Sequence, residues 1–121
     1  MTLQECYAAI GGDYEDVAAR LRSDRLVQKF LLRFLDDQSY ALFCTSMEEK
    51  NYEEAFRAAH TIKGICQNLS FTRLLESSSG MSEALRHGWT PKADELIRQL
   101  AEDYQLTVDG IRRFQRECGG Q

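Results

Sequence analysis

The sequence predicts an all-α protein, namely an antiparallel up-and-down four-helix bundle with additional short N-terminal helices. Apolar residues recur every three to four positions along almost all of the 121 residues, which is the spacing of amphipathic helices. No segment alternates apolar and polar residues as a half-buried strand would. The chain has a single proline, and few glycines interrupt its interior, so helices are not broken within their length.

Capping signals define two short helices at the start of the chain. Thr2 and Glu5 form a capping box for the first, and the glycine pair at 11–12 ends it. Asp13 has the acceptor side chain needed to begin a second helix, which we expect to run to about Arg22. Both helices are too short to bury a core of their own, so we expect them to cover one end of the bundle.

One further N-terminal helix and the first half of the bundle follow. Ser23 caps a segment with one apolar face, formed by Leu26, Val27, Phe30, Leu31, Phe34 and Leu35. A break at 36–39 precedes a helix from Tyr40, which carries Leu42, Phe43 and Met47. Asn51 then caps a long helix that runs to about Leu69.

The remaining two helices have well-marked ends. Ser70 is predicted to be a joint between two helices, and the helix after it ends in the basic turn and glycine of residues 86–88. Thr90 and Pro91 supply a cap and a first-turn proline for the last helix. Its apolar stripe comprises Ala93, Leu96, Ile97, Leu100, Tyr104, Val108, Ile111 and Phe114.

Length and charge restrict the classes of function. A chain of 121 residues fits one domain, which we expect to span 1–121, with cover helices over about 2–35 and the bundle over about 39–118. Fifteen basic against nineteen acidic residues give a net charge of −4, which disfavours binding to nucleic acid. We therefore expect no nucleic-acid partner, and we expect an isolated acidic bundle of this kind to be a monomer.

Membrane insertion and secretion are also disfavoured. The apolar stretch at 30–32 is flanked by Lys29 and Arg33, far short of the roughly 20 residues that a span requires. The N-terminal segment has no basic leader of the kind seen in a signal peptide. The cysteines have no paired short spacing and are expected as reduced thiols in the cytoplasm: Cys6, Cys44, Cys66 and Cys118.

One helix combines residues suited to chemistry. At about 100° per residue, the helix from 53 to 69 has a core face opposite His60, formed by Ala55, Ala58, Ile62, Ile65, Cys66 and Leu69. His60 should therefore be reachable from solvent. Lys63 lies one turn further, about 5 Å along the axis, where its ammonium can approach an anionic group on His60. Gly64 costs about 1 kcal/mol relative to alanine and removes the side chain beside the imidazole, which favours close approach by a partner.

The segment AHTIKGICQNLSFTRL resembles the histidine-containing phosphotransfer (HPt) domain family. The family pattern is a histidine, two variable positions, lysine and glycine, followed by a leucine-glycine turn. The positions that match are Ala59, His60, Ile62, Lys63, Gly64, Asn68 and Leu69. Ser70 stands where the family usually has glycine. Ser82 stands where several members have a glutamine directed at the histidine.

The resemblance implies a phosphorelay. A receiver domain with a phospho-aspartate, free or in a hybrid sensor histidine kinase, would dock on the bundle, pass its phosphoryl group to His60, and a second receiver would remove it. Because the receiver supplies Mg²⁺ and most of the charged groups, no cofactor is expected in this chain. Lys63 would be the cation that this chain supplies, and Gln67 would orient it or donate to a phosphoryl oxygen. The glycine pair at 11–12 is no ATP-binding loop, so the chain should be a carrier with no kinase activity of its own.

Phe56 is predicted to help bind the partner. It is an aromatic residue about 40° from His60 on a face that should be wet, and exposed aromatics near a site often anchor partners. We expect Phe56 to form a docking patch, with Arg57 at its rim. The alternative is that Phe56 folds over the N-terminal helices and completes the core.

Two other functions compete with the relay. The first is a bundle that docks receivers without accepting phosphate, although the joint presence of His60, Lys63 and Gly64 speaks against it. The second is a metalloprotein of the four-helix type, which would need Glu-x-x-His motifs. The residue three positions before His60 is Arg57, and His87 likewise lacks a glutamate there, so no metal site is expected.

Overall fold

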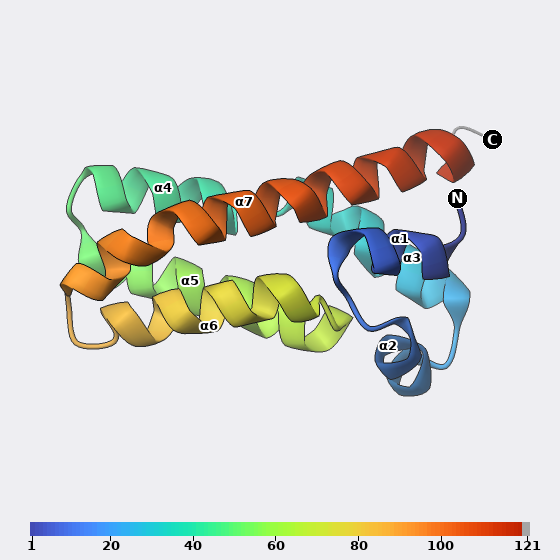
Figure 1. Ribbon diagram of the computed structural model, residues 1–121, viewed down its shortest axis with the longest axis horizontal. Coiled ribbons are helices and arrows are strands. Elements are labelled where there is room, and N and C mark those ends of the chain that lie inside the picture. The colour runs from blue at the N-terminus through green and yellow to red at the C-terminus, as the bar shows by residue number, and fades with distance from the viewer. Residues whose placement is uncertain (120–121) are drawn as a thin grey trace.

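The computed structural model describes residues 1–119, which form only helices, turns and loops (Figure 1). The elements are α1 (Leu3–Ile10), α2 (Tyr14–Leu21), α3 (Asp24–Arg33), the 3-10 turn η1 (Phe34–Asp36), α4 (Ser39–Glu48), α5 (Tyr52–Leu69), α6 (Thr72–Leu85), α7 (Pro91–Phe114) and the π-helical segment η2 (Gln115–Gly119). The all-α prediction is confirmed. Residues 120 and 121 of the predicted domain lie outside the described residues.

Helices α4 to α7 form the bundle, and each runs opposite to the one before it (Figure 1). Short connections force this arrangement, because a helix that follows a loop of two to five residues folds back on its predecessor. Helix α5 packs against both α4 and α6, and α7 packs against α6. On the remaining side, the rings of Tyr40 on α4 and Tyr104 on α7 stack with their centroids 4.0 Å apart.

The three N-terminal helices lie at the end of the bundle where α5 ends and α6 begins (Figure 1). Helix α1 packs along the C-terminal half of α7, and α3 contacts α5. The expected caps are present, since the side chains of Thr2, Asp13, Ser23 and Asn51 each accept a backbone N–H in the first turn that follows. These interactions fix the directions of the short helices.

Thr90 differs from its prediction. It occupies the position before α7, and Pro91 is the first helical residue, but the Thr90 hydroxyl does not cap α7. It donates instead to the carbonyl of Ala84 at 2.8 Å, near the end of α6. The hydroxyl therefore closes the α6–α7 connection, while the proline alone preorganises the first turn.

Several apolar residues of the predicted apolar faces are more exposed than expected. Leu26 and Ile97 are each 39% exposed, and Ile65 is half-buried. Each lies at the edge of its apolar stripe, and an edge residue is buried only where a neighbouring helix covers that edge. The centres of the same stripes, such as Val27 and Leu100, are fully buried as predicted.

Candidate functional site

Helix α5 carries the candidate site on its outer face. Its opposite face is buried in the core through Ala55, Ala58, Ala59, Ile62, Cys66 and Leu69. Because these residues recur with the helical period, they fix the rotation of α5 in the bundle. His60 then lies on the exposed face, as the periodicity predicts. The imidazole is thus reachable by a second molecule.

Phe56 lies against the imidazole. The rings of Phe56 and His60 are stacked, with centroids 5.8 Å apart and an angle of 24° between their planes. Phe56 is half-buried and packs partly on the hydrophobic core, so it forms a support between the core and the exposed histidine. The sequence predicts that Phe56 lies beside His60 but does not reveal this stack. The i,i+4 spacing of the two rings was the available signal.

Lys63 lies one turn beyond His60 on the side of α5 that faces α6. Its positive charge contributes to lowering the pKa of the Glu83 carboxyl on α6, although the hydrogen bond and charge of Arg86 have the larger effect. Lys63 is half-buried, and no carboxylate among residues 1–119 lies within 4.0 Å of its ammonium. The ammonium group therefore remains available to an incoming anion.

Gly64 leaves a gap in the surface next to His60. A Cβ atom built on Gly64 would meet no atom within 4 Å, so no neighbouring helix of this chain requires the missing side chain. Packing within the described residues gives no reason for a glycine that weakens the helix by about 1 kcal/mol. The bare backbone is a place where another molecule can come close.

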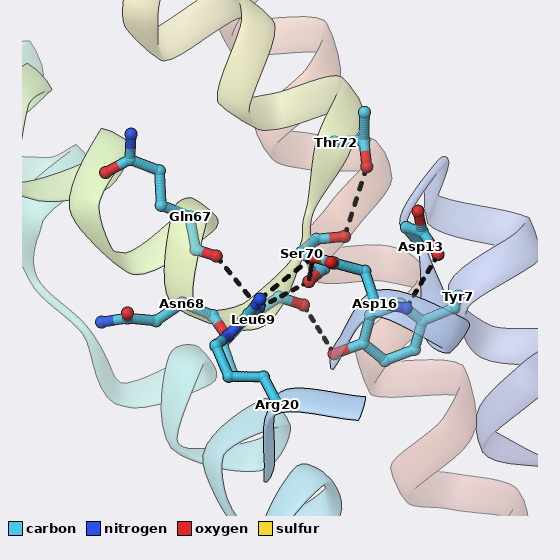
Figure 2. A network of polar contacts seen from close by, with 9 residues as sticks. All are labelled: Tyr7, Asp13, Asp16, Arg20, Gln67, Asn68, Leu69, Ser70 and Thr72. Carbon is cyan, nitrogen blue, oxygen red and sulfur yellow. Dashed lines mark hydrogen bonds and ion pairs between the residues drawn. The ribbon is translucent and has the colours of Figure 1, made fainter. Parts of the chain in front are cut away.

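Arg57 and Gln67 complete the set of predicted site residues. The Arg57 guanidinium pairs with Glu53 and Glu54 on its own helix, so its charge is compensated locally. Gln67 is exposed, and its side chain points away from the polar network below it (Figure 2). His60, Lys63, Gly64 and Gln67 share one exposed strip of α5.

The end of α5 is held by an arginine from α2. The guanidinium of Arg20 donates to the carbonyl of Gln67 at 3.1 Å and to the carbonyl of Asn68 at 2.7 Å (Figure 2). These two carbonyls belong to the last turn of α5 and receive no N–H bond from within the helix. A cation at this end of the helix also interacts favourably with the helix dipole. Arg20 thus caps α5 from a position 48 residues earlier in the sequence.

Ser70 adopts the left-handed conformation that usually favours glycine, with φ 57° and ψ 40°. Glycine suits the position because it adopts this conformation without strain. In this chain the hydrogen bonds of the Ser70 hydroxyl offset the strain. The Ser70 hydroxyl donates to the Asp16 carboxylate at 2.6 Å and accepts from Arg20 at 2.6 Å. Its hydrogen bond and that of Arg20 hold the pKa of Asp16 below its ordinary value.

Two more contacts join this turn to the N-terminal helices. The Tyr7 hydroxyl donates to the carbonyl of Leu69 at 2.9 Å (Figure 2). The backbone N–H of Asp13 donates to the carbonyl of Ser70 at 2.8 Å. The sequence predicts a joint at Ser70 but does not reveal these partners. The Asp16–Arg20 pair at i,i+4 was visible in the sequence, but nothing local indicated that it would reach α5.

Ser82 lies within the bundle. It is only 1% exposed, and its Oγ has no hydrogen-bond partner among the described residues. A hydroxyl sealed in this way is not presented at the surface on which His60 stands. The position where the family resemblance implies a glutamine in several members is filled here by a small buried side chain.

The sequence model of the Hpt domain matches residues 14–110, about four fifths of the chain. The chain belongs to the Hpt domain family. Hpt domains are helical bundles that carry phosphoryl groups on histidine in phosphorelays, and they interact with receiver domains and kinases without intrinsic kinase activity. Comparison with curated proteins and with solved structures gives no match.

The matched residues of this Hpt domain run from the start of α2 to within one turn of the end of α7. They include Arg20 and Asp16 of α2, which hold the end of α5. Among residues 1–119, no helix is long and apolar enough to cross a membrane. The same residues contain no group of three histidine, cysteine or acidic side chains arranged to hold a metal ion.

Proposed function

We propose that this Hpt domain carries a phosphoryl group on His60, taking it from the phospho-aspartate of one receiver domain and giving it to another. The observation that carries the proposal is the combination on one exposed strip of α5: a reachable imidazole, an unpaired ammonium one turn away, and bare backbone at Gly64. No other histidine has such a setting, since His87 is not followed by a lysine-glycine pair.

The chemistry requires little from this chain. A neutral nitrogen of His60 attacks the phosphorus of the phospho-aspartate, a P–N bond forms, and the P–O bond breaks so that the receiver recovers its carboxylate. The nitrogen proton of the ring is released to solvent or to the receiver. In such transfers positioning and charge stabilisation supply most of the rate enhancement. The Phe56 ring restrains the imidazole, and Lys63 offsets the charge of the phosphoryl oxygens.

The reverse sequence of steps passes the group to the second receiver. Gln67 lies one turn beyond Lys63, where its amide can orient the lysine or donate to a phosphoryl oxygen. We propose that Phe56 and Arg57 lie at the edge of the receiver contact. The protein acts as a monomeric cytoplasmic carrier without nucleic-acid partners, and it neither binds ATP nor phosphorylates itself.

A transfer assay tests the proposal directly. Purified receiver domains from the source organism are loaded with labelled phosphate, mixed with this protein, and the label is followed on both chains. We expect label on this chain that is labile in acid and stable in base, as a phosphohistidine is. Adding a second, unlabelled receiver should remove it.

Two histidine variants provide matched controls. His60→Gln should abolish labelling, whereas His87→Gln, at the other exposed histidine, should be labelled like the wild type. Both proteins should retain the helical circular dichroism spectrum. If His60→Gln still accepts label, or if the wild type binds receivers but never becomes labelled, the carrier function is wrong and a docking-only module remains.

A further inference from the structure

The positive charge of this acidic chain is concentrated in one segment. Residues 20–33 contain five basic residues and one acid, whereas the chain as a whole has net charge −4. This segment covers the end of α2 and all of α3. A basic surface on an acidic protein attracts an acidic partner selectively, and it does so at the end of the bundle next to the reactive helix.

A groove lies where this segment meets α5. It has a volume of about 390 Å³, and its walls come from α2, α3 with η1, and α5. Apolar side chains make up most of the lining, chiefly Leu21, Phe30 and Ile65. All three are half-buried, so each presents part of its apolar surface to the groove or to solvent. An apolar hollow of this size accepts an apolar side chain of a partner.

Cations border the groove without partners. Lys29 and the guanidinium of Arg33 both lie over the ring of Phe30, at 6.0 and 5.7 Å from its centroid. Neither has a carboxylate within 4.0 Å among the described residues. The single acid of the lining, Asp37, is engaged at the start of α4, where its carboxylate accepts the N–H of Ser39 at 2.9 Å. The rim therefore favours carboxylates on the partner.

The groove lies beside the C-terminal end of the strip that carries His60. Asn68 lines the groove and lies one turn beyond Gly64, two turns or about 12 Å along the axis from His60. A protein contact of standard size covers about 800 Å² on each partner, which is a disc of about 16 Å radius. A receiver centred on His60 therefore reaches the groove if it extends toward α3.

The other sides of His60 differ from the groove in how their charges are paired. Toward the start of α5, Arg57 is already paired with two glutamates. Toward α6, the charged pair of Glu83 and Arg86 is likewise closed at 2.9 Å. The hollow beyond the start of α5 also has a cation, Lys50, but its lining carries the acids Glu48 and Asp94. Toward α3, two cations without an ion pair among the described residues adjoin a lining with a single, engaged acid.

We infer that the groove between α3 and α5 is the specificity subsite for the receiver domain, and that it selects receivers that present an apolar side chain surrounded by carboxylates. This inference rests on the proposed function and adds the chemistry of the partner surface. The apolar side chain enters the hollow beside Phe30 and Ile65, and the carboxylates face Lys29 and Arg33. The contact acts on binding rather than on the transfer step.

The test compares two double variants with the same change in net charge. Lys29→Glu with Arg33→Glu reverses the rim, whereas Lys92→Glu with Arg98→Glu reverses two exposed cations of α7 outside the groove. A third variant, Ile65→Trp, fills the hollow without changing charge. Affinity for each purified receiver is measured by calorimetry, and label transfer by the assay above. Direct labelling of His60 with phosphoramidate shows that each variant is folded and reactive.

We expect the rim variant to bind receivers at least tenfold more weakly in 50 mM salt, with the loss falling below about threefold in 0.5 M salt because exposed charges are screened. The variant Ile65→Trp should lose about tenfold at both salt concentrations. The α7 control should bind within twofold of the wild type. At saturating receiver, the transfer rate of all variants should match the wild type.

Other outcomes overturn the inference. It is wrong if the rim variant and Ile65→Trp bind receivers as the wild type does, or if the α7 control weakens binding as much as the rim variant. It is also wrong if the groove variants abolish self-association in sedimentation, or binding to anionic lipid vesicles, while receiver binding persists. If receivers bind through the groove but no label moves, the subsite stands and the carrier function fails.

Discussion

Replacing Gly64 with alanine separates the stability of α5 from its accessibility. Alanine is favoured over glycine within a helix by about 1 kcal/mol. The new Cβ would meet no atom within 4 Å, so no clash reduces this gain. We therefore expect the free energy of unfolding to rise by about 1 kcal/mol and the melting temperature by about 4 °C.

The same methyl group should slow transfer from receivers. It lies on the exposed face one turn from His60, where the docked receiver must bring phosphorus to about 3 to 3.5 Å from the ring nitrogen. A displacement of 1 Å from that position can cost about 100-fold in rate. We expect Gly64→Ala to accept a phosphoryl group from a phosphorylated receiver at least tenfold more slowly than the wild type. Phosphoramidate is small, so it should label Gly64→Ala at a rate within twofold of the wild type.

Gly80→Ala is the matched control. Gly80 lies within α6, where an added Cβ would touch only Leu96 at 3.4 Å, and it lines a hollow toward α7 rather than the strip around His60. Thermal unfolding and receiver transfer are measured for both variants. If Gly64→Ala is more stable than the wild type and transfers at an unchanged rate, the bare backbone has no role in docking. If it is less stable, the space beside Gly64 is filled.

Three further predictions follow from buried or strained polar residues. Ser82→Ala should stabilise the protein by about 1 kcal/mol in chemical denaturation, because a buried hydroxyl without a partner is removed, and the transfer rate should not change. Ser70→Ala should lower the free energy of unfolding by about 1 to 2 kcal/mol, because the hydroxyl's hydrogen bonds are lost. Ser70→Gly loses the same bonds but relieves the left-handed strain, so its free energy of unfolding should stay within about 1 kcal/mol of the wild type. Equal losses in the two variants would disprove that strain. Asp103 has a pKa that burial would raise but that hydrogen bonds from Ser77, Arg73 and Gln99 hold below its ordinary value. The ionised carboxylate should therefore stabilise the folded protein fully above about pH 4, and this contribution should be lost as the pH falls through the lowered pKa of Asp103. Asp103→Asn should lower the free energy of unfolding in urea by about 2 kcal/mol at pH 7, and by progressively less below pH 4.

Local signals in the sequence were sufficient for the helices and for the exposed strip of α5. The side chains of Thr2, Asp13, Ser23 and Asn51 act within one turn of the helix that they begin, so neighbouring residues alone determine them. The exposure of His60 follows from the helical period, because the opposite face is continuously apolar. These predictions needed no knowledge of how the helices pack.

Contacts between distant segments were not predictable in the same way. Arg20 reaches the end of α5 across 48 residues, and its own helix shows only an ordinary i,i+4 pair with Asp16. Asp103 reads as a solvated residue of an amphipathic helix, yet it is 2% exposed and bonded to α6. Leu26 reads as core and is exposed. The environment of each of these residues depends on which helix packs against its side of the parent helix. The periodicity of the sequence does not encode that packing.

Helix α5 is anchored at its last turn but is left uncovered around Gly64. A carrier must hold its histidine steady and yet leave it open, and these demands conflict if the same stretch of helix serves both. In this chain they are met at different points. The last turn is fixed by Arg20 and Ser70, about two turns beyond His60, while the backbone at Gly64 is bare. Because a helix is stiff over two turns, anchoring one end restrains the imidazole without covering it. The anchor also belongs to the segment that borders the α3–α5 groove, so the helices that steady the reactive residue are those that we infer to select its partner.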